Sequence, residues 1–278
     1  MYMHVLLASA AFAQQPQNPS PMVEHTRMHT RLTMSEPAGR REALSLGTLF
    51  IPRKLVKKRT APLLLFFHGG TWVPEVAAAR NGDTAVISIQ IGSGSSVYAR
   101  QFEDNGKFEE LLFEAERQSG MKFNLLTIGG WSAGNGAVRE ILKSRDSYER
   151  VQRVLMIDGI HASYANGTPG PLESQIVPDN LQTILKLARD AIAGRKRVLI
   201  THSEIFPGTY ASTTETADYL VEQLGLKRKA VLRWGPMGSQ QLSEARQGKF
   251  KLAGFAGNSA PDHVDQLHSL HEYLKWLR

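Results

Sequence analysis

The stretch of residues 123–139 constrains the fold of this chain more than any other. Residues 123–128 form an apolar run of the kind found in a buried strand, and the residues from Ala133 onward suit a helix. Between them lies Gly130-Trp131-Ser132-Ala133-Gly134, a Gly-x-Ser-x-Gly pattern. When a strand turns directly into a helix, the backbone is crowded two residues before and after the turn, and only very small residues fit there. The pattern therefore predicts a strand, a sharp turn at Ser132 and a helix.

Ser132 is a candidate nucleophile. A serine hydroxyl becomes reactive only when it is held exposed, next to a base and close to backbone donors. The helix that follows the turn would direct its first N–H groups, including that of Ala133, at the place where an oxyanion forms. The pattern alone is weak in a chain with 24 glycines. The interpretation depends on the strand before it, the helix after it and a second motif upstream.

The second motif is an apolar run at residues 61–67 that ends in His68-Gly69-Gly70-Thr71-Trp72. It is typical of a strand buried on both faces that opens into a glycine turn, although an ordinary tight turn would look the same. With this His-Gly-Gly loop and the Gly-Trp-Ser-Ala-Gly turn in this order, the chain resembles the α/β-hydrolases, from about Ala43 to the C-terminal helix. The resemblance implies that Gly70 or Thr71 supplies a second oxyanion donor.

Strand-like runs alternate with helical patterns along the rest of the chain. Strands are expected at residues 43–55, 61–67, 84–91, 123–128, 154–157, 197–200 and 250–255, and helices at 107–118, from 133, and at 181–188, 214–225 and 264–277. This alternation predicts a mostly parallel sheet with helices on both faces and ligands at the carboxyl ends of its strands. We expect one α/β-hydrolase domain over residues 35–278, without a large cap domain.

A base and an acid should reach the same sheet edge as Ser132. His263 lies after the last strand, in a loop expected directly before the terminal helix, and is the candidate base. Two carboxylates compete as the acid: Asp158, directly after strand 154–157, and Glu204, just beyond strand 197–200, which is the more common position in the family. We favour Asp158, because a short side chain at a strand end is held more rigidly against the histidine.

Other aromatic and imidazole side chains are given lesser roles. Trp72, Trp131 and His161 are candidate substrate-binding residues, and Tyr164 and Tyr210 could also form walls of a pocket. In the expected terminal helix, His271 flanks the apolar face as a packed imidazole and His268 points away. These two have i, i+3 spacing but no third ligand nearby, so we expect no metal site. No cofactor is expected either.

The loop at residues 161–178 is rich in turn residues, including Asn166-Gly167 and Pro169-Gly170-Pro171. Such residues make turns rather than a packed lid, so an open, shallow cleft is expected.

These residues together predict a secreted serine hydrolase that cleaves carboxylic esters through a Ser132–His263–Asp158 triad and an acyl-enzyme. The substrate would be a small or polymer-linked ester. A peptidase or acyltransferase with the same triad is an alternative, because nothing in the sequence separates ester from amide turnover. A catalytically silent binding protein with this fold is another, but no member of the triad is missing.

The N-terminus and the charge bear on location and partners. Residues 1–13 contain an apolar run that ends in Ala11-Phe12-Ala13, a pattern of a secretory signal peptide, although no Lys or Arg precedes the run. An upstream start or a buried N-terminal segment would also explain this. Residues 14–34 are expected to form an extended leader, and the mature protein to be secreted or periplasmic. The net charge of +7 comes from small basic groups without interleaved aromatics, so nucleic-acid binding is not expected. No membrane span is expected.

Overall fold

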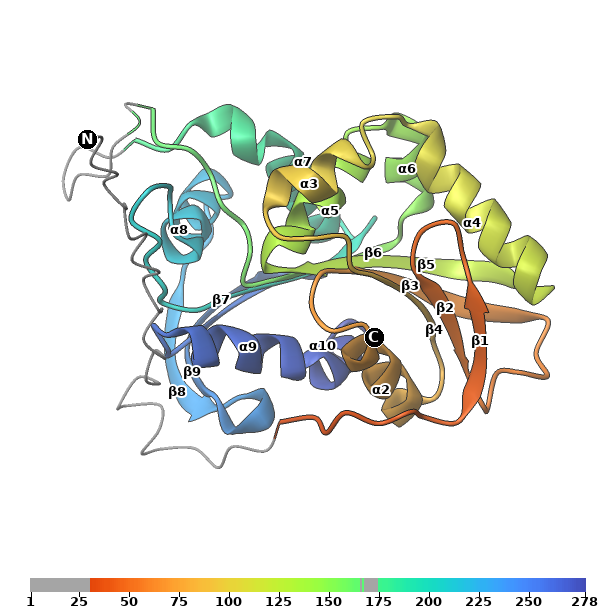
Figure 1. Cartoon of the computed structure of the whole chain (residues 1–278). Helices are drawn as coiled ribbons and strands as arrows, with labels where there is room; N and C mark the ends of the chain where they lie inside the picture. Colours follow the sequence, from red (N-terminus) through yellow and green to blue (C-terminus); the bar gives the residue numbers. More distant parts are fainter. Residues whose placement is uncertain (1–30, 166, 168–174) are drawn as a thin grey trace, which may run out of the picture.

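A ten-stranded sheet forms the centre of the molecule (Figure 1). The computed structural model describes residues 31–165, 167 and 175–278. In order across the sheet, the strands are β1 (Gly39–Ala43), β2 (Thr48–Pro52), β4 (Ala85–Ile89), β3 (Thr60–Phe67), β5 (Lys122–Trp131), β6 (Arg153–Ile157), β7 (Arg197–His202), β10 (Phe250–Phe255), β9 (Gln240–Gln247) and β8 (Lys229–Trp234). The six strands from β4 to β10 run parallel, and β1–β2, β2–β4, β10–β9 and β9–β8 pair antiparallel.

Helices cover both faces of this sheet (Figure 1). On the upper side in the figure lie α3 (Ser95–Arg100), α4 (Gly106–Ser119), α5 (Asn135–Ile141), α6 (Arg145–Arg150), α7 (Gln182–Ile192) and α8 (Thr213–Gln223). On the lower side lie α2 (Trp72–Asn81), α9 (Ala260–His268) and α10 (Leu270–Trp276). The described residues also form three short 3-10 helices: η1 (Ser132–Gly134), η2 (Pro178–Leu181) and η3 (Pro236–Gly238).

The two faces of the sheet belong to two separate hydrophobic cores. Strand β3 shows this most simply, because Leu63, Leu65 and Phe67 enter one core and Leu64 and Phe66 enter the other. Successive side chains of a strand point to opposite faces, so a strand buried on both sides must be apolar at every position. The continuous apolar run at residues 61–67 thus reflects its central place in the sheet. The predicted mostly parallel sheet with helices on both faces is confirmed.

Several element boundaries differ from the sequence predictions. The strand expected at residues 43–55 is the hairpin of β1 and β2, with a turn at Gly47, whose φ is +85°. The single terminal helix that was expected is two helices, because the helix is interrupted at Ser269 between α9 and α10. Helices α2, α3 and α6 and the β8–β9 hairpin were not expected. The sequence did not predict the hairpin because β8 is exposed at five of its six positions and β9 is largely polar. Neither strand therefore has the apolar pattern by which a strand is recognised.

The segment between Asp158 and Arg197 tests the expectation that no large cap covers the sheet edge. Among its described residues, only η2 and α7 are helical, and α7 packs on the sheet in the core that contains Leu63, Leu65 and Phe67. These elements are too small for a cap domain. The turns expected at Asn166 and at residues 169–171 lie outside the described residues, as do residues 1–30 with the expected signal peptide and most of the expected leader. In the described part, no helix has the length and apolar character needed to cross a membrane.

The chain at residues 31–34 is extended and lies against α9. The backbone N–H of Leu32 donates to His268 Nδ1 at 3.0 Å, and the Leu32 side chain is buried in the core that contains Leu64 and Phe66. Arg31 donates to Asp265 Oδ1 at 2.7 Å. This segment is therefore tied to the helix that also carries His263.

Candidate active site

The turn at Ser132 has the strained geometry that its sequence predicted. Strand β5 runs to Trp131, three residues beyond the expected end, and η1 and α5 follow at once. Ser132 has a φ of +49°, a left-handed conformation that is rare for a residue with a side chain. A Cβ atom at Gly130 would lie 2.6 Å from the carbonyl carbon of Gly134, and one at Gly134 would lie 2.0 Å from the Phe67 oxygen. The predicted need for very small residues at these two positions is confirmed.

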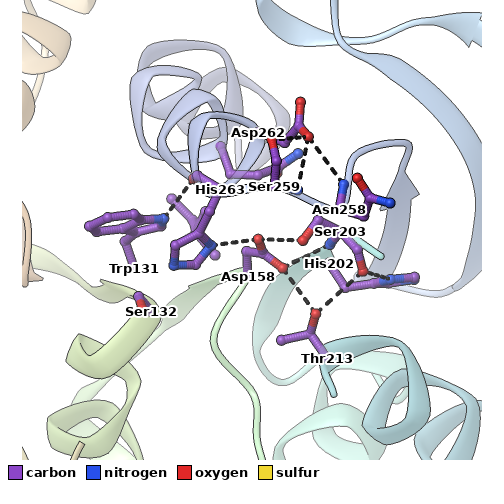
Figure 2. A network of polar contacts seen from close by, with 12 residues as sticks. Trp131, Ser132, Asp158, His202, Ser203, Thr213, Asn258, Ser259, Asp262 and His263 are labelled. Carbon is purple, nitrogen blue, oxygen red and sulfur yellow. Dashed lines mark hydrogen bonds and ion pairs between the residues drawn. The ribbon is translucent and has the colours of Figure 1, made fainter. Parts of the chain in front are cut away.

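The structure brings Asp158 and His263 together at the same end of the sheet as Ser132 (Figure 2). Asp158 directly follows β6, and His263 lies in the first turn of α9, not in a loop before it. The helix begins one residue after Ser259, whose capping box with Asp262 fixes the start. His263 Nδ1 donates to Asp158 Oδ2 at 2.7 Å. In Figure 2, Ser132 lies on the side of the imidazole that faces away from Asp158.

The Asp158 carboxylate accepts three more hydrogen bonds. Ser203 donates to it from its backbone N–H and from its hydroxyl, both at 2.7 Å, and the Thr213 hydroxyl donates at 3.0 Å. Burial would raise the pKa of Asp158, but the hydrogen bond and charge of His263, together with the bonds from Ser203, lower it to about 2. The group is therefore a buried anion at neutral pH. Sequence reasoning missed Ser203 and Thr213, although Ser203 directly precedes the competing Glu204.

Glu204 lies apart from this network. Glu204 is an exposed residue, and its backbone N–H donates to the Gly257 oxygen at 2.8 Å. Over the described residues, its carboxylate makes no hydrogen bond or ion pair. Of the two carboxylates that the sequence offered, only Asp158 contacts His263.

A cavity of about 220 Å³ opens beside Ser132 and His263. Its lining residues are Ser132, Asp158, His161, Ile205, Pro207, Tyr210, Thr213, Ala260 and His263. His161 is held by a hydrogen bond between its Nδ1 and the Ala211 oxygen at 3.2 Å, and its ring meets the edge of Tyr210. Burial lowers the pKa of His161, so this imidazole is neutral at pH 7. Of the candidate substrate-binding residues, His161 lines the cavity and Trp72 and Trp131 do not.

Trp131 instead supports the histidine. Its ring lies between His68, at a centroid distance of 5.2 Å, and His263, at 4.5 Å, and its Nε1 donates to the His263 oxygen at 2.9 Å. Trp72 packs against His268 from the start of α2. The residue between Gly130 and Ser132 thus holds the candidate base in place rather than forming the wall of a pocket.

The His-Gly-Gly loop is held in an unusual backbone conformation. His68 and Gly69 have φ values of +73° and +95°. The Gly69 N–H donates to Gln90 Oε1 at 2.9 Å, and Tyr98 binds both this oxygen and His68 Nδ1. Gly70 and Thr71 are exposed residues, and within the described part of the chain their N–H groups make no hydrogen bond.

The N–H of Ala133 belongs to the first turn of η1. The first N–H groups of a helix have no partner within that helix. Ala133 therefore offers a donor directly beside Ser132, as the sequence led us to expect.

The remaining histidines of the C-terminal region have structural contacts. His268 does not point away from the apolar face as expected: it is buried, because the Leu32 N–H donates to its Nδ1 and the Trp72 ring packs against it. His271 is buried as expected. Across residues 31–165, 167 and 175–278, no group of three His, Asp or Glu side chains is placed to hold a metal ion.

Comparisons with known proteins give similar solved structures. No protein-family model matches the chain, and the comparison with curated proteins gives no match. An acetyl xylan esterase from Aspergillus awamori is 15% identical with a TM-score of 0.49, over 83% of this chain and 92% of that one. A poly(3-hydroxybutyrate) depolymerase from Bordetella parapertussis is 12% identical with a TM-score of 0.49, over 86% and 91%. A carboxylesterase from Bacillus subtilis is 12% identical with a TM-score of 0.44, over 87% and 92%.

The chain's own architecture decides its fold. The mostly parallel sheet, the helices on both of its faces and the tight strand-to-helix turn at Ser132 are the features that the sequence resemblance implied. The chain has the α/β-hydrolase fold.

Proposed function

We propose that this protein is a serine hydrolase that cleaves carboxylic esters, with Ser132 as nucleophile, His263 as base and Asp158 as acid. One observation carries the proposal: the hydrogen bond of 2.7 Å between His263 Nδ1 and the buried Asp158, beside a cavity that Ser132 also lines. Acyl transfer of this kind uses three groups: a serine nucleophile, an imidazole that accepts its proton and a carboxylate that orients the imidazole.

The steps follow from the protonation states of these groups. Because Asp158 holds the proton of His263 on Nδ1, the Nε2 atom is free to accept the proton of Ser132 as its oxygen attacks the acyl carbon. The N–H of Ala133 and that of Gly70 or Thr71 stabilise the negative oxygen of the tetrahedral intermediate. His263 then returns the proton to the departing alcohol. Water attacks the acyl-enzyme in the same way and regenerates the Ser132 hydroxyl.

Labelling with a fluorophosphonate tests the proposal directly, because this reagent bonds only to an activated serine. We expect the intact protein to be labelled at Ser132 and the Ser132→Ala variant to remain unlabelled. Ser163→Ala, which removes an exposed serine outside the network, is the matched control and should label fully. The kcat of Ser132→Ala on a p-nitrophenyl ester should fall by at least about a hundredfold. A folded protein that takes no label would instead be a catalytically silent binding protein with the same fold.

We also propose that the protein is exported, on the basis of the apolar run and the Ala11-Phe12-Ala13 sequence at its N-terminus. Expression of the full chain in a bacterium, followed by mass spectrometry of its N-terminus, tests this. A mature protein that begins at Gln14 outside the cytoplasm is expected. A chain that keeps residues 1–13 in the cytoplasm would refute export.

A further inference from the structure

The His-Gly-Gly loop runs beside the turn that carries Ser132. Phe67, the last residue of β3, pairs with Gly130 of β5, two residues before Ser132. A Cβ atom on Gly69 would lie 3.4 Å from a carbon of the Trp131 ring. The loop and the turn are therefore neighbours, and the shape of the loop determines where its N–H groups lie relative to Ser132.

Two residues with positive φ, His68 and Gly69, come directly before Gly70 and Thr71. A residue with a side chain, such as His68, is uncommon in this conformation and keeps it only where its surroundings enforce it. The sheet reaches no further than His68, whose N–H donates to the Ile89 oxygen at 3.0 Å, because β4 ends at Ile89. The next N–H of the loop, that of Gly69, lies beyond the last carbonyl group of this strand.

The side chain of Gln90 provides the acceptor instead. Gln90 directly follows β4, and its Oε1 accepts from the Gly69 N–H at 2.9 Å. Gln90 is exposed, but Tyr98 of α3 is fully buried, and its hydroxyl donates to the same Oε1 at 3.0 Å. The Gly92 oxygen, 3.2 Å from that hydroxyl, accepts from Gln90 Nε2 at 3.3 Å. Only the oxygen of an amide accepts hydrogen bonds, so these contacts together fix the orientation of the Gln90 side chain.

The same hydroxyl group fixes the His68 ring. Because the Tyr98 proton goes to Gln90, the Tyr98 oxygen accepts from His68 Nδ1 at 2.9 Å. Burial and, to a lesser degree, the charge of His263 lower the pKa of His68, so its imidazole is neutral at pH 7. The ring stacks at 15° on Trp131, which also contacts His263. One buried hydroxyl therefore holds both the loop and the aromatic stack beside the base.

We propose that Gln90 and Tyr98 are positioning residues of the ester hydrolysis: they hold the positive-φ turn so that the N–H groups after it are in place before an ester binds. This role rests on the function proposed above. Donors that are already in place stabilise an oxyanion without the cost of ordering them during the reaction. Loss of either side chain therefore weakens an interaction that is made only in the transition state, and it lowers kcat and kcat/KM by the same factor.

Two substitutions test this role by steady-state kinetics. Tyr98→Phe removes only the hydroxyl, and Gln90→Met keeps the length of the side chain without its amide. We expect each to lower kcat and kcat/KM on p-nitrophenyl butyrate at least about tenfold. The double variant should be no more than about twofold slower than the slower single variant, because both side chains act through one acceptor.

Tyr148→Phe is the matched control. It removes another buried tyrosine hydroxyl, which donates to Asp190 at 2.6 Å from α6, and should keep the kcat of the parent. Thermal unfolding of each variant checks the fold. If the control loses as much kcat as Tyr98→Phe, the loss reflects stability alone and the proposed role is overturned.

Hydrogen exchange tests the positioning without any catalysis. Measured by mass spectrometry on the peptide that contains Gly69, exchange should be at least about tenfold faster in Gln90→Met than in the parent and unchanged in Tyr148→Phe. Exchange that stays the same in Gln90→Met would overturn the proposal, as would an active parent whose Gln90 and Tyr98 variants keep their kcat. A parent that hydrolyses no ester and takes no fluorophosphonate label would instead refute the proposed function, and this role with it.

Discussion

Asp158 and Glu204 each follow a parallel strand and were both candidates for the acid. Their surroundings in the folded protein determine which one contacts His263. Both follow a parallel strand, so the order of elements could not separate them. In the structure, Asp158 is buried with four hydrogen bonds, whereas Glu204 is exposed and has no contact with His263. The side chain one residue before Glu204, that of Ser203, completes the Asp158 network instead. Which of two neighbouring residues points inward depends on backbone geometry that residue types alone do not reveal.

A pair of substitutions tests the acid. Asp158→Asn and Glu204→Gln each keep the shape of the side chain and remove its charge. We expect Asp158→Asn to lower kcat on a short ester by roughly a thousandfold or more, because an amide can hold the wrong tautomer of His263. Glu204→Gln should stay within about twofold of the parent. Steady-state kinetics measure both variants. A severe loss of kcat in Glu204→Gln alone would make Glu204, and not Asp158, the acid.

The low pKa of Asp158 also links stability to pH. Its pKa is about 2 in the folded protein and ordinarily 3.8, so the unfolded chain binds this proton more readily. The resulting stability is complete above the ordinary value and is lost as pH falls through the folded value. The shift corresponds to something on the order of 2 kcal/mol in the free energy of unfolding.

Urea unfolding between about pH 5 and pH 2 measures this contribution when the parent is compared with Asp158→Asn. The difference in unfolding free energy between the two proteins should shrink toward the acid end, because only the parent has this carboxylate to protonate. A difference that stays constant over the range would show that Asp158 titrates normally.

At the scale of elements, the strand-to-helix turn could be predicted and the end of the sheet could not. The apolar run before Ser132 and the flanking glycines are local signals, and the crowding that they imply is found at Gly130 and Gly134. Strand β8 has no such signal, because an edge strand exposed at almost every position has no buried face to mark it. The break between α9 and α10 left the apolar spacing of the terminal segment intact, so it too was not visible in the sequence.

Gly134 offers a test of the crowded turn. Its φ is −59°, which alanine adopts without strain, so what opposes a Cβ atom there is Phe67, whose oxygen, carbonyl carbon and Cβ would lie 2.0, 2.5 and 2.9 Å away. We expect Gly134→Ala to lower the free energy of unfolding by more than about 3 kcal/mol, although alanine favours helices. Gly106→Ala, at the exposed start of α4, is the control and should be nearly neutral. Chemical denaturation measures both, and equal stability of the two variants would mean that the turn can relax.

At the scale of the whole molecule, the small cavity beside Ser132 favours short acyl chains for the ester hydrolysis that we propose. Its volume of about 220 Å³ is smaller than the range of roughly 300–1,000 Å³ typical of sites for drug-sized ligands. We expect kcat/KM to be highest for esters with acyl chains of about two to four carbons and to fall at least tenfold for chains of about twelve. A series of p-nitrophenyl esters measures this, with simple saturation and no rise in rate when the substrate forms droplets. A preference for the long chains, together with such a rise, would indicate a lipase.

The contact of residues 31 and 32 with α9 has a practical consequence for anyone who prepares this protein. A recombinant fragment trimmed to the regular secondary structure would begin near β1 and discard the bonds from Arg31 to Asp265 and from Leu32 to His268. The helix that loses them is the one that presents His263 to Asp158. We therefore expect a fragment that begins after Leu32 to lose esterase activity, and a purification tag or a protease site is better placed upstream of Arg31.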